Sequence, residues 1–298
     1  MLHHYNEFVG FSLHENFQIS IESLSASPMI QAVFVFTFGC KISDMIQFFA
    51  SDYQGPAFEL LGPAHIAALT VLVALNLFLL RFRYSSDVTK SFIRWLLALI
   101  LLGNEIAWHY WNYAVGRWTI QTMLPLHLCS LLVWTGVFML LTKSYRIYEF
   151  MYFMGIGGAI QALATPDLGI YGFPHFRFFQ TFLSHGLIIT SAIFMTVVIG
   201  LRPTWRSILR VAIWMNIYAG IVYFINTQIG SNYLMLNYKP DTPSLLNLLP
   251  PWPIYILYME AIGLVTCLLL YIPFIIKDWR NKYVMNKDNA SRLESISK

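Results

Sequence analysis

The dominant pattern in this sequence is a series of long apolar segments separated by short polar ones. From Leu61 onward, seven segments are each long enough, allowing for tilt and helix caps, to cross a lipid bilayer as a helix. They are residues 62–80, 92–114, 122–142, 148–165, 177–200, 206–229 and 252–276. The pattern therefore predicts an all-α, polytopic membrane protein with a bundle of seven transmembrane helices.

Residues 1–46 do not follow this pattern. They hold scattered charged and histidine residues and one apolar run, Met29 to Cys40. At about 12 residues this run is too short to span a membrane, and it lacks the basic start of a signal peptide. We expect an N-terminal extension that is interfacial or not native, with Met45 as an alternative start. The predicted membrane domain then covers residues 47–280, followed by a polar cytoplasmic tail, residues 281–298.

Lysine and arginine residues gather in alternate loops. Fifteen follow the first, third, fifth and seventh spans, whereas four lie on the opposite side: Lys41, Arg117, Arg177 and Lys239. Because cytoplasmic loops of membrane proteins are enriched in these two residues, the bias predicts an external N-terminus and a cytoplasmic C-terminus.

Composition supports the membrane assignment and argues against a soluble domain, a nucleic-acid-binding protein and a cysteine-based framework. Only 11% of residues are charged, against roughly 25% in soluble domains, and 57% are hydrophobic. The formal charge of +4 is small and its basic residues lie in loops, so we expect no nucleic-acid partner. The three cysteines, Cys40, Cys129 and Cys267, are too widely separated for a disulfide framework or a paired-cysteine zinc site.

Polar residues within the predicted spans concentrate toward the outside. Ionisable residues in a span cost about 2.5–3.5 kcal/mol on insertion scales, so a functional role is the first expectation. The pattern predicts an outward-opening polar cavity. Simpler alternatives are that Glu105 and His109, at i and i+4, satisfy each other, and that His65 only packs near the interface. The residues concerned are His65, Glu105, His109, His127, Cys129, Gln161, His185, Asn226 and Glu260, with Asp167 and Asn232 in the outer loops.

The segment Leu124-Pro125-Leu126-His127-Leu128-Cys129-Ser130 places a thiol at the mouth of an apolar helix. Pro125 suits the first turn of a helix, which would put Cys129 about one turn inside, near the positive end of the helix dipole. That position favours a thiolate. His127 lies only two residues away and would point elsewhere, so a base must come from another helix. The alternative is an inert buried thiol, which is what we expect of Cys267.

Several ordered motifs resemble the YwaF-like family of bacterial membrane proteins over about residues 47–280. These are Gly62-Pro63-Ala64-His65, the Leu124–Ser130 segment, Gln161-Ala162 with Thr165-Pro166-Asp167, Phe178-Phe179-Gln180 with Ser184-His185-Gly186, Asn232-Tyr233, Lys239-Pro240, and Pro251-Trp252-Pro253 with Glu260. The resemblance implies a multi-pass protein of the bacterial cytoplasmic membrane.

The YwaF-like family is related to the eukaryotic transmembrane protein 164 family, whose members are described as acyltransferases that move fatty acyl chains between phospholipids. Their catalytic cysteine and histidine would correspond to Cys129 and His185. A more distant similarity is to the androgen-induced lipid hydrolases, which use a threonine nucleophile; here that position is Cys129. The resemblance therefore implies a cysteine-dependent lipid acyltransferase or lipid hydrolase, with a membrane lipid or acyl chain as substrate.

The chemistry of acyl transfer gives roles to further residues. A thiolate that attacks an ester needs a base, an oxyanion site and access for an apolar chain. Cys129 and His185 are expected at a common depth. Glu105 or Glu260 would orient the imidazole, and the candidate oxyanion donors are His127, Asn226 and Asn232. This mechanism calls for no cofactor and no metal, and the sequence does not indicate an oligomeric state.

Two other functions fit the same polar residues. One is a metal-dependent intramembrane hydrolase, with zinc ligands drawn from His65, Glu105, His109, His127 and His185. The other is a non-enzymatic transporter or receptor for a small ligand, although the chain has no internal repeat or paired broken helices of the transporter kind. Gly155-Ile156-Gly157-Gly158 indicates close helix packing, and no Lys-Ser or Lys-Thr follows it as a phosphate loop would require.

Overall fold

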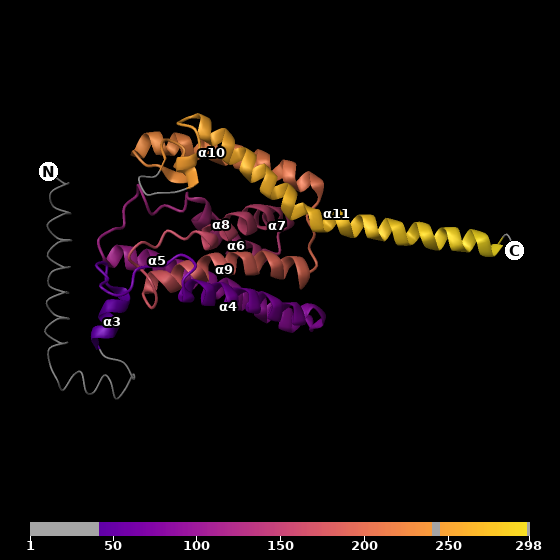
Figure 1. Ribbon diagram of the computed structural model, residues 1–298, viewed down its shortest axis with the longest axis horizontal. Helices are drawn as coiled ribbons and strands as arrows, with labels where there is room; N and C mark the ends of the chain where they lie inside the picture. Colours follow the sequence, from indigo (N-terminus) through magenta and orange to yellow (C-terminus); the bar gives the residue numbers. More distant parts are fainter. Residues whose placement is uncertain (1–41, 240–244, 297–298) are drawn as a thin grey trace.

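The computed structural model describes residues 42–239 and 245–296. In these ranges the protein consists of long apolar helices and short helical segments and has no strand (Figure 1). Five of the described helices are long and apolar enough to cross a membrane. They are α4 (Pro63–Leu79) with its extension η1 (Leu80–Tyr84), α5 (Asp87–Ala114), α9 (Phe176–Val197), α10 (Trp205–Ile229) and the first part of α11 (Ile254–Ile296). The predicted all-α, multi-pass membrane architecture is therefore confirmed.

The other two predicted spans, 122–142 and 148–165, have a different form. The first is α6 (Leu128–Thr142), whose 15 residues extend only about 22 Å. The second is a rod of three consecutive segments: α7 (Tyr145–Phe150), the π-helix η2 (Met151–Gly155) and α8 (Ile156–Ala164). The count of seven spans and the orientation of the termini stay predictions. Short elements complete the fold: α3 (Ile42–Phe49), η3 (Tyr233–Met235) and η4 (Leu245–Leu248).

Helix α9 lies at the centre of the bundle, between α4 and α6 (Figure 1). In its most apolar stretch 72% of the residues are buried inside the protein, compared with 28% or less for the other candidate spans. It packs against α4, α5, α6 and α8. Ile188 and Phe194 on its surface are fully buried in the main apolar core, together with Leu132 of α6. The polar groups of α9 therefore face protein rather than lipid.

Glycines at the end of η2 and in α8 permit close packing of neighbouring helices. A Cβ atom on Gly155 would lie 3.2 Å from Ile188 of α9, and one on Gly157 would lie 2.7 Å from the Cγ2 methyl of Thr266 on α11. Small residues let helix backbones approach in this way. The predicted packing role of this glycine cluster is confirmed.

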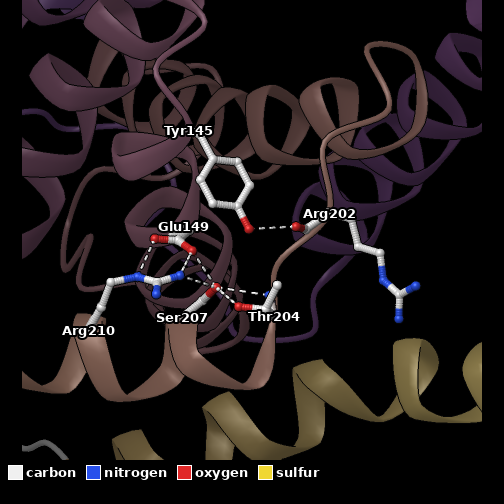
Figure 2. A network of polar contacts seen from close by, with 6 residues as sticks. All are labelled: Tyr145, Glu149, Arg202, Thr204, Ser207 and Arg210. Carbon is white, nitrogen blue, oxygen red and sulfur yellow. Dashed lines mark hydrogen bonds and ion pairs between the residues drawn. The ribbon is translucent and has the colours of Figure 1, made fainter.

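A buried carboxylate joins α7 to the start of α10 (Figure 2). Glu149 is 2% exposed and accepts a hydrogen bond of 2.5 Å from the Ser207 hydroxyl. It also accepts two hydrogen bonds from the Arg210 guanidinium, one of them 2.9 Å from Nε to Oε2. Beside this network, the Tyr145 hydroxyl donates to the Arg202 carbonyl at 2.9 Å. These bonds fix the α7–η2–α8 rod against α10 at the predicted cytoplasmic end.

One predicted helix start is wrong. The helix expected to begin at Pro125 begins at Leu128. The preceding residues form a turn in which the Leu126 N–H donates to the Leu124 carbonyl at 2.7 Å, and the Tyr218 hydroxyl of α10 donates to the Leu126 carbonyl at 2.9 Å. These two carbonyls are thus engaged outside a helix, and tertiary contacts override the preference of Pro125 for a first turn.

Helix α11 is longer than the predicted span 252–276, because it continues to Ile296. The sequence that follows Ile276 has no glycine or proline up to that point, so nothing in the chain ends the helix there. Figure 1 shows this continuation extending beyond the bundle. The predicted domain boundary at residue 46 lies within α3, and residues 1–41 lie outside the described residues.

Candidate functional site

Glu105 of α5 lies where three helices meet. It is 2% exposed, and its carboxylate interacts with His185 of α9 and with Cys129 and Ser130 of α6. His109, one turn further along α5, places Nε2 3.5 Å from Glu105 Oε1. Within the described residues, this buried Oε1 atom has no hydrogen-bond partner. A buried carboxylate oxygen without a hydrogen bond is costly, and the nearby His109 imidazole is the group that partly compensates it.

Cys129 is the second residue of α6 and is partly buried. His127 occupies the N-cap position, but its side chain does not cap the helix. The first N–H groups of a helix have no partner within it, so backbone donors lie beside the thiol. The His127 ring instead packs edge-on against Tyr233, with centroids 4.9 Å apart. No hydrogen bond links the Cys129 thiol to His185 in the part of the chain that the structure describes.

The tautomer of His185 follows from its hydrogen bond. Its Nδ1 atom lies 2.8 Å from the Thr181 carbonyl oxygen one turn earlier in α9. A carbonyl can only accept, so Nδ1 carries the proton and Nε2 is left with a free lone pair. His185 therefore presents the nitrogen that a general base requires, while Thr181 fixes the ring.

Arg177 lies in the first turn of α9, two turns before His185. Its guanidinium lies 3.9 Å from the centroid of the Trp108 ring and donates 2.5 Å to Gln180 Oε1. Its charge also acts on His185 and on Asp167. Sequence reasoning counted Arg177 only as an outer basic residue. Its place in the first turn of a predicted span that carries His185 is the signal that would have identified it.

The structure separates the remaining predicted site residues from this cluster. His65 is buried, accepts from the Leu61 N–H and donates to the Leu163 carbonyl, which is a structural role. Asn226 accepts from Ser231 and from the Tyr233 N–H after α10, and Asn232 accepts from the Asn237 N–H in the same loop. The side chains of Gln161, Asp167 and Glu260 are exposed. Of the two carboxylates proposed to orient the imidazole, only Glu105 interacts with it.

Metal ligands are not grouped. Among the described residues, no three His, Cys, Asp or Glu side chains are close enough together to hold a metal ion. His65 and His127, two of the five ligands considered for zinc, are engaged with backbone groups and with Tyr233 respectively. Helices α5, α6 and α9 thus place a thiol and an imidazole within electrostatic range of the Glu105 carboxylate, on the predicted outer side of the bundle.

Comparison with known proteins identifies the family. Searches among curated proteins and among solved structures found no match. The family model described as the TMEM164 family matches residues 60–271, a range that contains all four residues of the Glu105, His109, Cys129 and His185 cluster. This confirms the predicted relation to transmembrane protein 164, while the bacterial YwaF-like branch stays a prediction. Because the match covers well over half of its 298 residues, the chain belongs to the TMEM164 family of membrane proteins.

Proposed function

We propose that this protein is a membrane-embedded lipid acyltransferase or lipid hydrolase in which Cys129 is the nucleophile and His185 the base. The observation that carries the proposal is the buried Glu105 carboxylate, which lies within electrostatic range of both residues and has one oxygen without a hydrogen bond among the described residues. The activity is the one that the sequence resemblance implies, and membership of the TMEM164 family is compatible with it.

The first half-reaction transfers an acyl group to the enzyme. Cys129 Sγ attacks the ester carbonyl of a phospholipid as His185 Nε2 takes the thiol proton. The oxyanion accepts hydrogen bonds from the free N–H groups at the start of α6. Collapse breaks the ester C–O bond, the leaving alcohol takes the proton from His185, and an acyl thioester remains on Cys129.

The second half-reaction separates transferase from hydrolase. His185 removes a proton from the hydroxyl of an acceptor lipid or from water, and the resulting oxygen nucleophile breaks the thioester. Cys129 leaves as a thiolate and is reprotonated by His185. In both halves the imidazolium forms within electrostatic range of Glu105, whose carboxylate offers the compensating negative charge.

Arg177 fits the role of a phosphate-orienting residue. Its cation rests on Trp108 and on the neutral Gln180, and it forms no ion pair within 4 Å in the described part of the chain. A guanidinium in this setting retains capacity for a phospholipid phosphate.

We further propose seven spans with the N-terminus outside, and placement in a bacterial cytoplasmic membrane.

The test is acyl turnover by purified protein reconstituted with phospholipid that carries a labelled acyl chain. We expect Cys129→Ala and His185→Ala to abolish turnover while the protein stays monodisperse. Cys129→Ser should be much slower, because a serine hydroxyl needs stronger assistance from a base. Cys267→Ala is the matched control: this thiol lies in the apolar core on α11, away from the proposed site, so full turnover is expected.

Two results locate the chemistry. Intact-mass spectrometry of the active protein should detect a covalent acyl group that hydroxylamine removes and that is absent in Cys129→Ala. Product analysis then distinguishes the reactions, since free fatty acid indicates a hydrolase and a newly acylated lipid a transferase. Full turnover by Cys129→Ala would refute the nucleophile, and lipid binding without any turnover in the unaltered protein would favour a ligand-binding role instead.

A further inference from the structure

A polar cavity lies at the other end of α5, α6 and α9, away from Cys129. Its volume is about 230 Å³. Lys90, Ser91 and Arg94 on the first turns of α5 line one side, and Lys143 at the end of α6 lines another. Residues 198–199 at the end of α9 add an apolar surface. Because a water molecule occupies about 30 Å³ in the liquid, the cavity has room for a small polar headgroup.

Arg94 is a buried cation within this cavity wall. The residue is only 6% exposed, and its Nη atoms donate to the carbonyls of Leu140 and Leu141 and, at 3.3 Å, to Ser91 Oγ. Its Nε atom is buried and has no hydrogen-bond partner among the described residues. No carboxylate there forms an ion pair with it. A buried charge of this kind normally has a counter-ion, and here all of its protein acceptors are neutral.

The other charges of the cavity reinforce that of Arg94. Lys90 and Lys143 also form no ion pair in the described ranges, and Asp87 is the single carboxylate among the lining residues. Three cations against one carboxylate leave an excess of two positive charges. The excess lies next to Ser91, whose hydroxyl can donate a hydrogen bond.

We propose that this cavity is a binding site for a phosphate-bearing anion, held by Lys90, Arg94 and Lys143. Phosphate oxygens would accept from both lysines and from the Ser91 hydroxyl and would balance the charge of Arg94, while residues 198–199 contact the carbon part of the ligand. Basic pockets between membrane helices on the cytoplasmic side are suited to anionic lipid headgroups, and a soluble phosphate ester offers the same chemistry. The site is separate from the proposed acyl chemistry.

The test uses purified full-length protein in a non-ionic detergent and two probes, phosphatidylglycerol and glycerol 3-phosphate. Binding of each probe is measured by native mass spectrometry and by titration calorimetry. The variant is Lys90→Gln with Lys143→Gln, which leaves Arg94 and its bonds to α6 intact. The matched control is Arg81→Gln with Arg83→Gln, which removes the same charge from exposed residues of the neighbouring η1 turn.

We expect the lysine double variant to lose about 30-fold in affinity for the probe that binds, because each lysine near a phosphate surface is worth roughly fivefold. The arginine double variant should bind like the unaltered protein. Binding of phosphatidylglycerol that glycerol 3-phosphate does not displace identifies a lipid headgroup, and binding of glycerol 3-phosphate alone identifies a soluble ester. Equal affinities in the two double variants, or no binding of either probe to the unaltered protein, would overturn the proposal.

Discussion

The contact between Gly157 and Thr266 sets how closely α8 and α11 approach. A Cβ atom added at Gly157 would lie 2.7 Å from Thr266 Cγ2, closer than two carbon atoms can approach. Thr266 cannot simply rotate away, because its hydroxyl donates 2.8 Å to the Ile262 carbonyl. Gly157→Ala must therefore separate the two helices or break that hydrogen bond.

The neighbouring Gly158 serves as a control that separates the overpacking cost from the effect of adding a methyl group to a helix. A Cβ on Gly158 would lie 3.5 Å from Leu128, an ordinary contact. Both Gly→Ala changes gain roughly 0.5–1 kcal/mol of backbone entropy in a helix. Only Gly157→Ala adds overpacking, which costs about 1–3 kcal/mol. The difference between the two variants should equal the overpacking cost, or about 2–4 °C in melting temperature for each kcal/mol.

Thermal unfolding in detergent, followed by circular dichroism, measures this difference. Thr266→Ser supplies a rescue, since it removes the Cγ2 methyl and keeps the hydroxyl. Combined with Gly157→Ala, it should recover most of the lost stability, whereas combined with Gly158→Ala it should recover none. If Gly157→Ala proved as stable as Gly158→Ala, the close approach of α8 and α11 would be wrong.

Three further predictions concern the ends of the bundle. Arg210→Ala leaves Glu149 buried without its cation, so we expect a lower melting temperature, partly restored by Lys at the same position. Burial lowers the pKa of His175, whose neutral ring donates to the Ala50 carbonyl. Its contribution is complete above the unfolded pKa of about 6.5 and is lost as pH falls through the lower folded value, so acidification should lower the melting temperature less in His175→Gln than in the unaltered protein. A chain that begins at Met45 keeps the aromatic contacts of α3 with α9, and we expect it to insert and to elute as a monodisperse species; aggregation would contradict this.

Five of the seven predicted spans match long apolar helices among the described residues, because apolar length is visible in the sequence. The predicted ranges 92–114, 177–200 and 206–229 each overlap one long helix, with ends that differ by at most five residues. The start of α6 was not predictable, because Tyr218 comes from a helix more than 90 residues away and holds Leu126 outside the helix. Local propensity at Pro125 contains no information about that contact.

The candidate site was predictable in part for a similar reason. An ionisable residue in a span is visible in sequence, and Glu105 lies within electrostatic range of Cys129 and His185, whose catalytic roles stay predictions. Their mutual arrangement depends on how α5, α6 and α9 rotate, which apolar segments do not specify. Asn226 shows the limit: it is polar and placed in a span like the others, yet its amide organises the loop after α10.

The central position of α9 has a consequence for biogenesis. Its polar side chains include Thr181, Ser184 and His185, which would face lipid if this otherwise apolar segment entered the bilayer alone. Most of its surface is covered by α4, α5, α6 and α8, all of which precede it in the chain and leave the ribosome first. We therefore expect α9 to integrate stably only by packing against helices that have already been inserted. A substitution that disrupts α5 or α6 should then reduce the insertion of α9.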